Sequence, residues 1–325
     1  MSFYNEPLQW IHSSIQSILE QTFKDFELII ICDNADNIEG LEYIKGLCKS
    51  DSRISLIAND TNLGPTRSFN IAIAAAQGEY IARMDADDIA LPERLAKQVE
   101  FLDNNPHISV CATDAHIIDD KGNIKRRNRY KHKRETALNV ISNCIAHPSV
   151  MFRRNLLELR NPLYNENYTY SQDYELWQFL ILQGKQFHTL EEVLLLYRKS
   201  PKQISKSKKQ RQISLFKQAH KSFVLNWLIQ HNIITNNESN DLKLVLTKAS
   251  EALKNLHKTQ QESHEVRQFL TYIIYVIYFS LGTREGIYKW KYLTDSNLIA
   301  LRIRFIYSYR LFFSSKRRRD RNTIL

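Results

Sequence analysis

Apolar residues between Pro7 and Cys111 alternate between helical spacing and short continuous runs. Across residues 8–20 they fall on one helical face, which is formed by Trp10, Ile11, Ile15, Ile18 and Leu19. Residues 26–31 form a continuous apolar run, which is typical of a strand buried on both faces. Repeated alternation of such helices and strands predicts an α/β domain built around a mostly parallel sheet.

The same criteria predict the remaining elements. Helices are expected at residues 39–49, 66–76, 93–104 and 172–183, and strands at residues 54–58, 79–84, 108–111, 149–153 and 193–197. A hairpin is expected at Asp120-Lys121-Gly122, and only helices are expected after Lys199. We therefore predict a catalytic α/β domain over residues 1–199 and a basic, all-helical region over residues 200–325.

Polar loops follow three of the predicted strands. They begin at Asp33, span residues 59–64 and span residues 85–88. Ligands of open α/β sheets bind beyond the carboxyl ends of the strands. We therefore expect the three loops to converge on one crevice.

The net charge of the chain indicates which kind of molecule it binds. The chain has 45 Lys and Arg residues against 35 Asp and Glu residues, a net charge of +10 that favours an anionic partner. Nucleic acid, acidic lipid and phosphorylated substrates all satisfy that condition. The excess is concentrated in the second half, with dense basic runs at residues 199–211 and 316–321.

The cysteines argue against disulfides and zinc. Four of them lie far apart without a C-x-x-C pair, namely Cys32, Cys48, Cys111 and Cys144. No signal peptide is recognised, so we expect reduced thiols and a cytoplasmic location. The longest apolar stretch, residues 269–281, is shorter than the roughly 20 residues of a membrane-spanning helix.

One acidic motif carries candidate chemistry. Asp85-Ala86-Asp87-Asp88 follows a predicted strand directly, and carboxylates at alternate positions can turn toward one hard cation. A solvated loop or a helix cap would have the same composition. Both interpretations stay open on the motif alone.

The surrounding sequence resembles the inverting family 2 glycosyltransferases with the GT-A fold. The resemblance is carried by residues 78–88, by Leu91-Pro92-Glu93-Arg94, by Phe3-Tyr4-Asn5-Glu6, by residues 17–22 and 26–33, and by Asn62-Leu63-Gly64 with Arg67 and Asn70. It covers residues 2–198 and implies a Rossmann-like mixed sheet flanked by helices. The first strand is expected to be shortened, because Tyr4 follows so closely on Met1.

The resemblance also implies a donor site. It assigns nucleotide-sugar binding to Tyr4, Asn5, Glu6, Asp33, Arg67, Asp85 and His147. It assigns metal binding to Asp85 and Asp87, with Mg²⁺ or Mn²⁺ as the ion and most commonly a UDP-sugar as the donor. His147 would contact the diphosphate or the acceptor, although a histidine there is also compatible with simple packing.

The segment Ser171-Gln172-Asp173-Tyr174-Glu175-Leu176-Trp177 resembles the one that holds the family's general base, with Asp173 at that place. The alternative is a carboxylate that only stabilises a helix N-terminus. Glu175 should point elsewhere, since it lies two residues further along the helix. Arg83 is compatible with a charge partner of Asp85 or Asp87 and with an ordinary salt bridge, and we leave it out of the predicted site.

The predicted function is inverting sugar transfer from a nucleotide diphosphate to an acceptor hydroxyl. Glycans or lipid-linked saccharides of cell-surface assembly are the expected acceptors. Residues 298–313 mix arginines with aromatic residues and precede a basic run, which fits either a helix on anionic membrane lipid or a packed helix with a solvated end. Two alternatives are a nucleotidyltransferase that forms nucleotide sugars and a nucleic-acid-binding protein. The latter leaves the acidic motif unexplained, so we expect no nucleic-acid partner.

Overall fold

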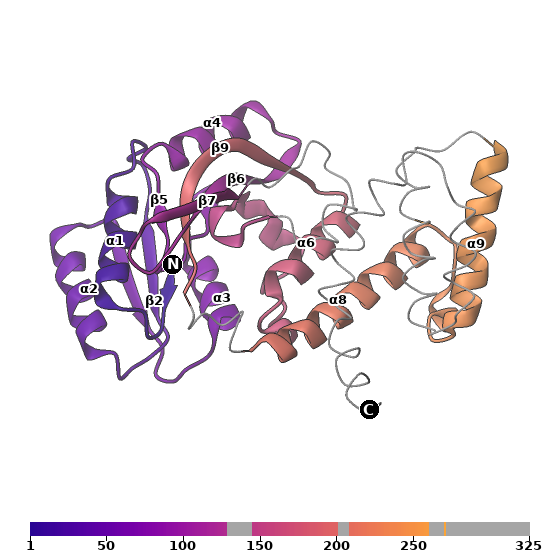
Figure 1. The fold of residues 1–325 in the computed structure, drawn as a ribbon, viewed down its shortest axis with the longest axis horizontal. Coiled ribbons are helices and arrows are strands. Elements are labelled where there is room, and N and C mark those ends of the chain that lie inside the picture. The colour runs from indigo at the N-terminus through magenta and orange to yellow at the C-terminus, as the bar shows by residue number, and fades with distance from the viewer. Residues whose placement is uncertain (129–144, 201–207, 260–269, 271–325) are drawn as a thin grey trace, which may run out of the picture. The chain divides into compact units, whose positions relative to one another are not determined.

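The computed structural model describes residues 1–128, 145–200, 208–259 and 270. The chain divides into two compact units, residues 1–220 and residues 221–325 (Figure 1). The predicted domain boundary near Lys199 stays a prediction.

Three parallel strands begin the first unit. They are β1 (Ser2–Phe3), β2 (Leu28–Cys32) and β3 (Ile54–Ala58), in the order β1-β2-β3. Every residue of β2 is buried, as expected for an apolar strand covered on both faces. Helices α1 (Leu8–Leu19) and α2 (Ile38–Ser50) lie on one face, and α3 (Pro65–Ala75) lies on the other (Figure 1).

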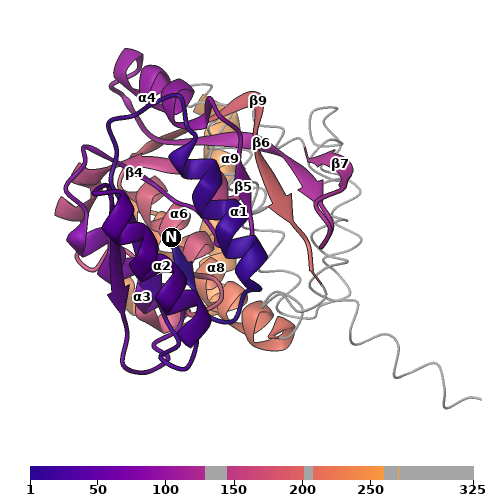
Figure 2. The ribbon, with the colours of Figure 1, turned by 90° about the vertical axis from the view of Figure 1, so that its left-hand side faces the viewer.

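A second, mixed sheet holds the other strands of this unit. Its order is β4-β8-β6-β9-β5, with β7 paired to β6. The strands are β4 (Tyr80–Ala82), β5 (Ile89–Ala90), β6 (Ile108–Ile118), β7 (Ile124–Asn128), β8 (Met151–Arg153) and β9 (Gln186–Arg198). Strand β7 lies outermost beside β6 (Figure 2). The predicted mixed sheet flanked by helices is thus confirmed.

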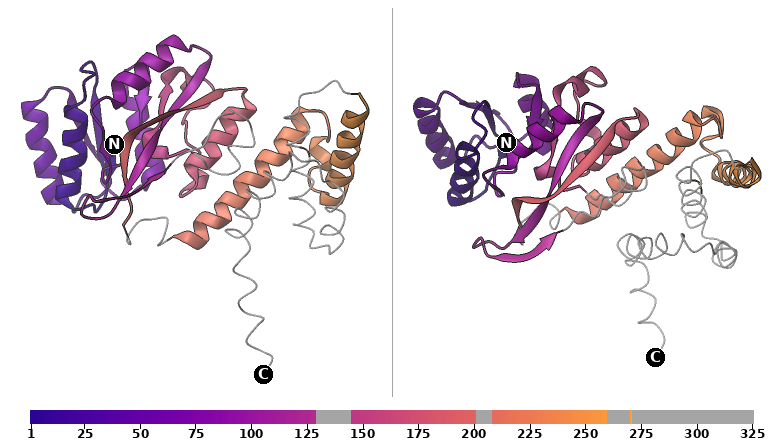
Figure 3. Two further views of the ribbon diagram at one scale, coloured as in Figure 1. Left: turned by 45° about the horizontal axis from the view of Figure 1, so that its top comes forward. Right: turned by 90° about the horizontal axis from the view of Figure 1, so that it is seen from above.

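The long parallel pair β6 and β9 is the main departure from the predicted elements (Figure 3). The apolar pattern predicted strands at residues 108–111 and 193–197, and the observed strands are much longer. Thr113 and Asp114 interrupt the apolar run of β6, yet both are buried. Asp114 accepts a hydrogen bond from Arg127 Nη2 at 3.0 Å, so a tertiary partner allows a polar residue inside this strand.

The helices agree closely with the sequence pattern. Besides α1 to α3, the first unit contains α4 (Arg94–Asn104), α6 (Gln172–Leu182) and the beginning of α8 (Lys209–Gln230). Gly64 precedes α3 with φ +81°, a conformation that favours glycine, and Pro65 occupies the first helical position. This turn aims the backbone N–H groups of residues 63 and 64 toward the neighbouring strand end.

Two of the apolar clusters in the first unit hold most of its helices against its strands. One packs α1 and α2 against the parallel strands, with Ile15 and Ile30 fully buried. The other packs α3 and α6 against β6 and β8 around Trp177, which is 1% exposed. Trp177 is therefore a core residue, and it anchors the helix that begins beside Asp173.

The described part of the second unit is helical. It comprises the rest of α8, a short 3-10 helix at Asn236–Glu238 and α9 (Leu242–Thr259). Among the described residues, no helix is both long and apolar enough to cross a membrane. Cys32, Cys48 and Cys111 are free thiols. Cys144 and the predicted segments 269–281 and 298–313 fall outside the described residues, apart from Leu270.

Candidate active site

The carboxyl ends of neighbouring strands bring the predicted loops together. Phe3 pairs with Cys32 on one side of β1, and Ser2 forms a parallel bridge with Asp85 on the other. The residues that follow β1 therefore lie between Asp33 and the acidic loop, which we define as residues 85–88. The predicted convergence of the three loops is therefore present in the structure, and the crevice between them stays a prediction.

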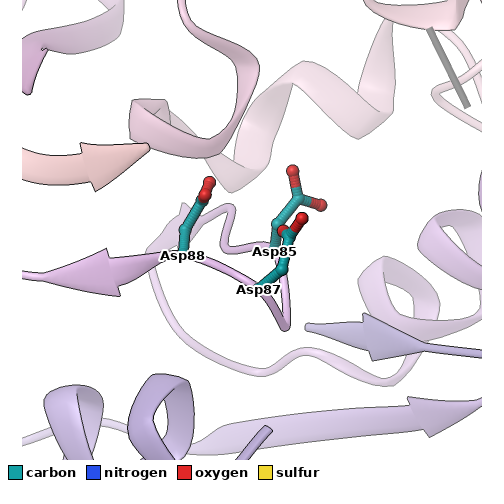
Figure 4. Close-up of side chains that lie close together, drawn as sticks. All are labelled: Asp85, Asp87 and Asp88. Atoms are coloured by element: carbon teal, nitrogen blue, oxygen red, sulfur yellow. The ribbon is translucent and has the colours of Figure 1, made fainter. Parts of the chain in front are cut away.

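Three carboxylates cluster in the acidic loop. Asp85, Asp87 and Asp88 each offer an oxygen, and these oxygens lie within 4.8 Å of one another. Their side chains point to the same side of the loop (Figure 4). Like charges this close repel one another unless a cation or protons neutralise them. An all-oxygen donor set fits Mg²⁺ or Mn²⁺, and Asp85 and Asp87 are the predicted ligands.

Asp88 is the buried member of this cluster. Its Oδ1 accepts the backbone N–H of Arg198 at 2.7 Å, and its Oδ2 is buried without a hydrogen-bond partner. Burial raises the pKa of Asp88 well above its usual value, and the charges of Asp87 and Asp85 add to this effect. A neighbouring cation would offset the repulsion, so the cluster is chemically suited to one.

Arg83 supplies a positive charge from the strand side. Its Nη1 lies 2.5 Å from Asp85 Oδ2, and its guanidinium stands 4.8 Å from the centre of the Phe69 ring. The Arg83 side chain is only 11% exposed. This residue, which the predicted site omitted, is therefore the ion-pair partner of a predicted metal ligand.

Asp173 lies at the first turn of α6, as predicted for the general base. It is half-buried, and its Oδ1 accepts the backbone N–H of Tyr174 at 2.8 Å. Glu175 points elsewhere, as expected, because Arg160 binds both of its carboxylate oxygens at 2.7 and 2.9 Å. The two acidic residues of this turn therefore have different surroundings.

Tyr164 is a buried tyrosine whose hydroxyl lies near charged residues of the predicted site. Burial raises the pKa of its hydroxyl, Arg83 opposes this, and the carboxylates of Asp173 and Asp85 both raise it further. Both carboxylates thus act on one buried hydroxyl. No sequence motif identified Tyr164, because its neighbours come from distant parts of the chain.

His147 packs beside the same hydroxyl. Its Nε2 lies 2.6 Å from Tyr164 Oη, and its ring meets Phe69 and Trp177 edge to face. Burial, assisted by the charge of Arg83, lowers the pKa of His147 well below its usual value. The imidazole is therefore enclosed, and its surroundings favour the neutral form. Its predicted contact with the diphosphate or acceptor stays a prediction.

Asp33 organises the loop after β3. Its carboxylate accepts hydrogen bonds from Asn59 Nδ2, Leu63 N and Gly64 N, each at 2.8 Å. Only 5% of Asp33 is exposed. The side chain shapes the predicted nucleotide end of the crevice, and its direct contact with a nucleotide stays a prediction.

The loop after β1 is held by polar contacts. Glu6 Oε2 accepts the backbone N–H of Tyr4 at 2.6 Å, and Asn5 Oδ1 accepts Asn34 Nδ2 at 2.6 Å. Burial raises the pKa of Glu6, and the nearby charge of Asp85 contributes to the rise. The Tyr4 side chain is exposed and open to a ligand.

Arg67 projects from the first turn of α3. Its Nε donates to Glu166 Oε2 at 2.8 Å, and its side chain is 57% exposed. One turn later, Asn70 Nδ2 donates to the Tyr164 carbonyl and Asn70 Oδ1 accepts the Tyr164 N–H, both at 2.9 Å. Helix α3 thereby fixes the position of Tyr164.

Arg198, at the end of β9, was not recognised from the sequence. Its Nε donates to the Asp87 carbonyl at 2.7 Å, and its Nη1 donates to the Asp119 carbonyl at 2.9 Å. Its guanidinium also stands 4.8 Å from the centre of the Trp10 ring. The acidic loop is therefore tied to the last strand of the sheet.

Comparison with known proteins identifies the family. The glycosyl transferase family 2 model matches residues 1–160. An uncharacterized glycosyltransferase of Methanocaldococcus jannaschii is 39% identical over 221 residues, which are 66% of this chain and 76% of that protein. The chain belongs to glycosyl transferase family 2. The O-antigen biosynthesis glycosyltransferase WbnJ of Escherichia coli is 32% identical over 203 residues, 61% of this chain and 78% of WbnJ.

Solved structures show the fold of this family 2 member. TarS residues 1–349 of S. aureus, in complex with UDP-GlcNAc, superpose with a TM-score of 0.58 at 17% identity, covering 85% of this chain and 78% of that one. The mannosyltransferase PcManGT from Pyrobaculum calidifontis, with GDP-Man and Mn²⁺, gives 0.52 at 15% identity over 84% and 83%. The predicted GT-A fold is confirmed, and this family 2 member is a nucleotide-sugar-dependent glycosyltransferase.

Proposed function

We propose that this glycosyltransferase moves a sugar, with inversion, from a UDP-sugar to an acceptor hydroxyl. The observation that carries the proposal is the cluster of Asp85, Asp87 and Asp88 after β4, whose carboxylate oxygens lie within 4.8 Å of one another. Such a cluster suits a divalent cation that would hold the donor diphosphate. Donor and acceptor would meet between the acidic loop and Asp173.

Asp85 and Asp87 would hold Mg²⁺ or Mn²⁺, which supplies positive charge to the leaving diphosphate. The acceptor oxygen forms its bond to the anomeric carbon as the bond from that carbon to the diphosphate oxygen breaks. Asp173 takes the proton of the acceptor hydroxyl. One displacement of this kind inverts the anomeric configuration.

The donor would occupy the crevice between the loop after β1 and α3. The nucleotide would be surrounded by Tyr4, Asn5, Glu6, Asp33 and Arg67. His147 would contact the diphosphate or the acceptor. The UDP-GlcNAc bound to the TarS structure supports a uridine donor, and the GDP-Man and Mn²⁺ of PcManGT support a metal-assisted diphosphate.

The acceptor would be a glycan or a lipid-linked saccharide of a cell-surface polymer. The name of WbnJ, which refers to O-antigen biosynthesis, supports this class. The net charge of +10 supports peripheral contact with anionic lipid at the cytoplasmic face of the membrane. Such contact would bring the site to a membrane-bound acceptor.

Two substitutions test this assignment. Asp87→Asn should abolish Mn²⁺-dependent donor binding, because it removes a charged ligand. Asp173→Asn should keep donor binding and lower transfer by roughly 10²- to 10⁴-fold, the usual contribution of a general base. The measurements are nucleotide release from a panel of nucleotide sugars with and without EDTA, and donor binding by calorimetry.

Asp25→Asn is the matched control, because Asp25 is exposed and precedes the amino end of β2, whereas the proposed site lies beyond the carboxyl end of that strand. Its activity should equal that of the native protein. Full turnover in both the Asp87 and Asp173 variants would refute the proposed site. Release of pyrophosphate from a nucleoside triphosphate plus a sugar phosphate would instead indicate a nucleotidyltransferase.

A further inference from the structure

The residues that lead into α6 are held by a helix that follows them by about forty positions. We define residues 168–174 as the base segment, because it ends beside Asp173. The Tyr174 ring stacks on Phe216 of α8 with centroids 3.6 Å apart and planes inclined by 15°. The Tyr174 hydroxyl lies 2.9 Å from His220 Nδ1. The contacting residues all belong to the first unit.

A second contact lies at the other end of the base segment. Gln212 Nε2 donates to the Tyr170 carbonyl at 2.9 Å, and the Arg211 guanidinium stands 5.8 Å from the Tyr170 ring centre. Tyr168 and Tyr174 also share an apolar cluster with Ala219. The first three turns of α8 therefore hold the base segment on both sides of Asp173.

The contact with α8 holds Tyr170 in an unfavourable backbone conformation. Tyr170 has φ +136°, which is rare for a residue with a side chain and costs on the order of 1–3 kcal/mol. Such a conformation persists only where its surroundings impose it. Here its N–H donates to Gln172 Oε1 at 3.1 Å and its carbonyl accepts from Gln212. The turn that directs Asp173 thus depends on α8.

We propose that Gln212, Phe216 and His220 are positioning residues for glycosyl transfer. They act through Tyr170 and Tyr174 to fix the direction of the Asp173 carboxylate. The inference rests on the proposed role of Asp173 as general base. It also gives three side chains at the beginning of α8 a positioning role, although the sequence pattern assigned this helix to the C-terminal region.

A double-mutant cycle with Asp173→Asn tests the inference. Gln212→Leu removes the donor to Tyr170 at similar side-chain volume, so the carboxylate should lose its alignment. We expect kcat to fall roughly 10- to 100-fold, as for other small misplacements of a catalytic group, with donor KM unchanged. In the Asp173→Asn background the same substitution should change kcat less than about twofold, because aligned and misaligned amides are equally inactive.

Gln218→Leu is the matched control, since Gln218 is exposed on the same helix. If Gln212→Leu does not fold, Phe216→Leu is measured in both backgrounds with the same expected result. Equal losses of kcat in both backgrounds, a raised donor KM or an unchanged kcat would overturn the positioning role. Full transfer by Asp173→Asn would overturn both the base assignment and the inference. A loss of kcat in Asp173→Asn with an unchanged kcat in Gln212→Leu would overturn the inference alone and leave the proposed function standing.

Discussion

The acidic loop and the base segment, the two halves of the proposed active site, are held in place by different means. The acidic loop follows a strand, and a backbone bridge between Ser2 and Asp85 sets its place in the sheet. The base segment contains a backbone conformation of high energy at Tyr170 and is held by α8. One half of the site is fixed by strand register and the other by tertiary packing.

Because of this difference, we expect the two halves of the proposed site to respond differently to substitution. Strand register is rigid, which suits carboxylates that must keep their separation around a cation. The base segment is held by a few side chains, so its alignment depends on each of them. Substitutions near the acidic loop should therefore act through charge, and substitutions near the base segment should act through geometry.

The largest effect is expected at the ion pair beside the acidic loop. Arg83→Met removes the cation 2.5 Å from Asp85 and leaves a partly buried carboxylate unpaired. Breaking a buried pair in this way costs about 3–5 kcal/mol, so the free energy of unfolding should fall by about 3 kcal/mol. Mn²⁺ should restore more stability to the variant than to the native protein, because it replaces the lost positive charge.

Urea unfolding with and without Mn²⁺ measures both effects. Arg126→Met is the control, because Arg126 is exposed on β7. If Mn²⁺ stabilises the Arg83 variant no more than the native protein, then the acidic loop does not act through charge.

The next effect is a pH dependence from His220, the α8 residue whose ring nitrogen faces the Tyr174 hydroxyl. Burial lowers the pKa of His220 from 6.5 to about 4. Between these values the unfolded chain binds a proton that the folded chain does not, so stability rises with pH across this window and is independent of His220 above it. The shift corresponds to at most about 3 kcal/mol. Loss of stability on acidification from pH 6.5 to 4 should therefore be smaller in His220→Gln.

Thermal unfolding of both proteins across this pH range supplies the measurement. His107→Gln serves as a control, since His107 is exposed and lies away from α8 in the sequence. Equal slopes in the native and His220→Gln proteins would show that the imidazole is not held neutral against Tyr174.

The sequence predicted the first half of this site better than the second. Helices α1 to α4 begin and end within about two residues of their predicted positions, and Asp85 follows its strand as expected, because apolar periodicity and strand order are local signals. Tyr164 and the contact between Gln212 and Tyr170 have no local signal. They depend on which helix packs against which loop, and apolar spacing does not specify such contacts.

A smaller effect on stability and kcat is expected at the contact between Asn70 of α3 and Tyr164. Asn70→Ala removes two hydrogen bonds of 2.9 Å and leaves the backbone N–H and carbonyl of Tyr164 without partners. An unsatisfied buried group costs about 1–3 kcal/mol, so we expect a loss of about 2 kcal/mol together with a lower kcat. Urea unfolding and the transfer assay measure these, with the exposed Asn104→Ala as control. Loss of stability without loss of kcat would separate Tyr164 from catalysis.

The smallest effect divides the contact between Tyr174 and α8 into its two parts. Tyr174→Phe deletes the hydroxyl that lies 2.9 Å from His220 Nδ1 and keeps the ring that stacks 3.6 Å from Phe216. A single hydrogen bond contributes about 1 kcal/mol, so stability should fall by that amount and kcat by less than about threefold. Phe216→Leu removes the stacking instead and should lower kcat further. If Tyr174→Phe lowers kcat more than Phe216→Leu, then the hydrogen bond to His220, and not the aromatic contact, directs the base segment.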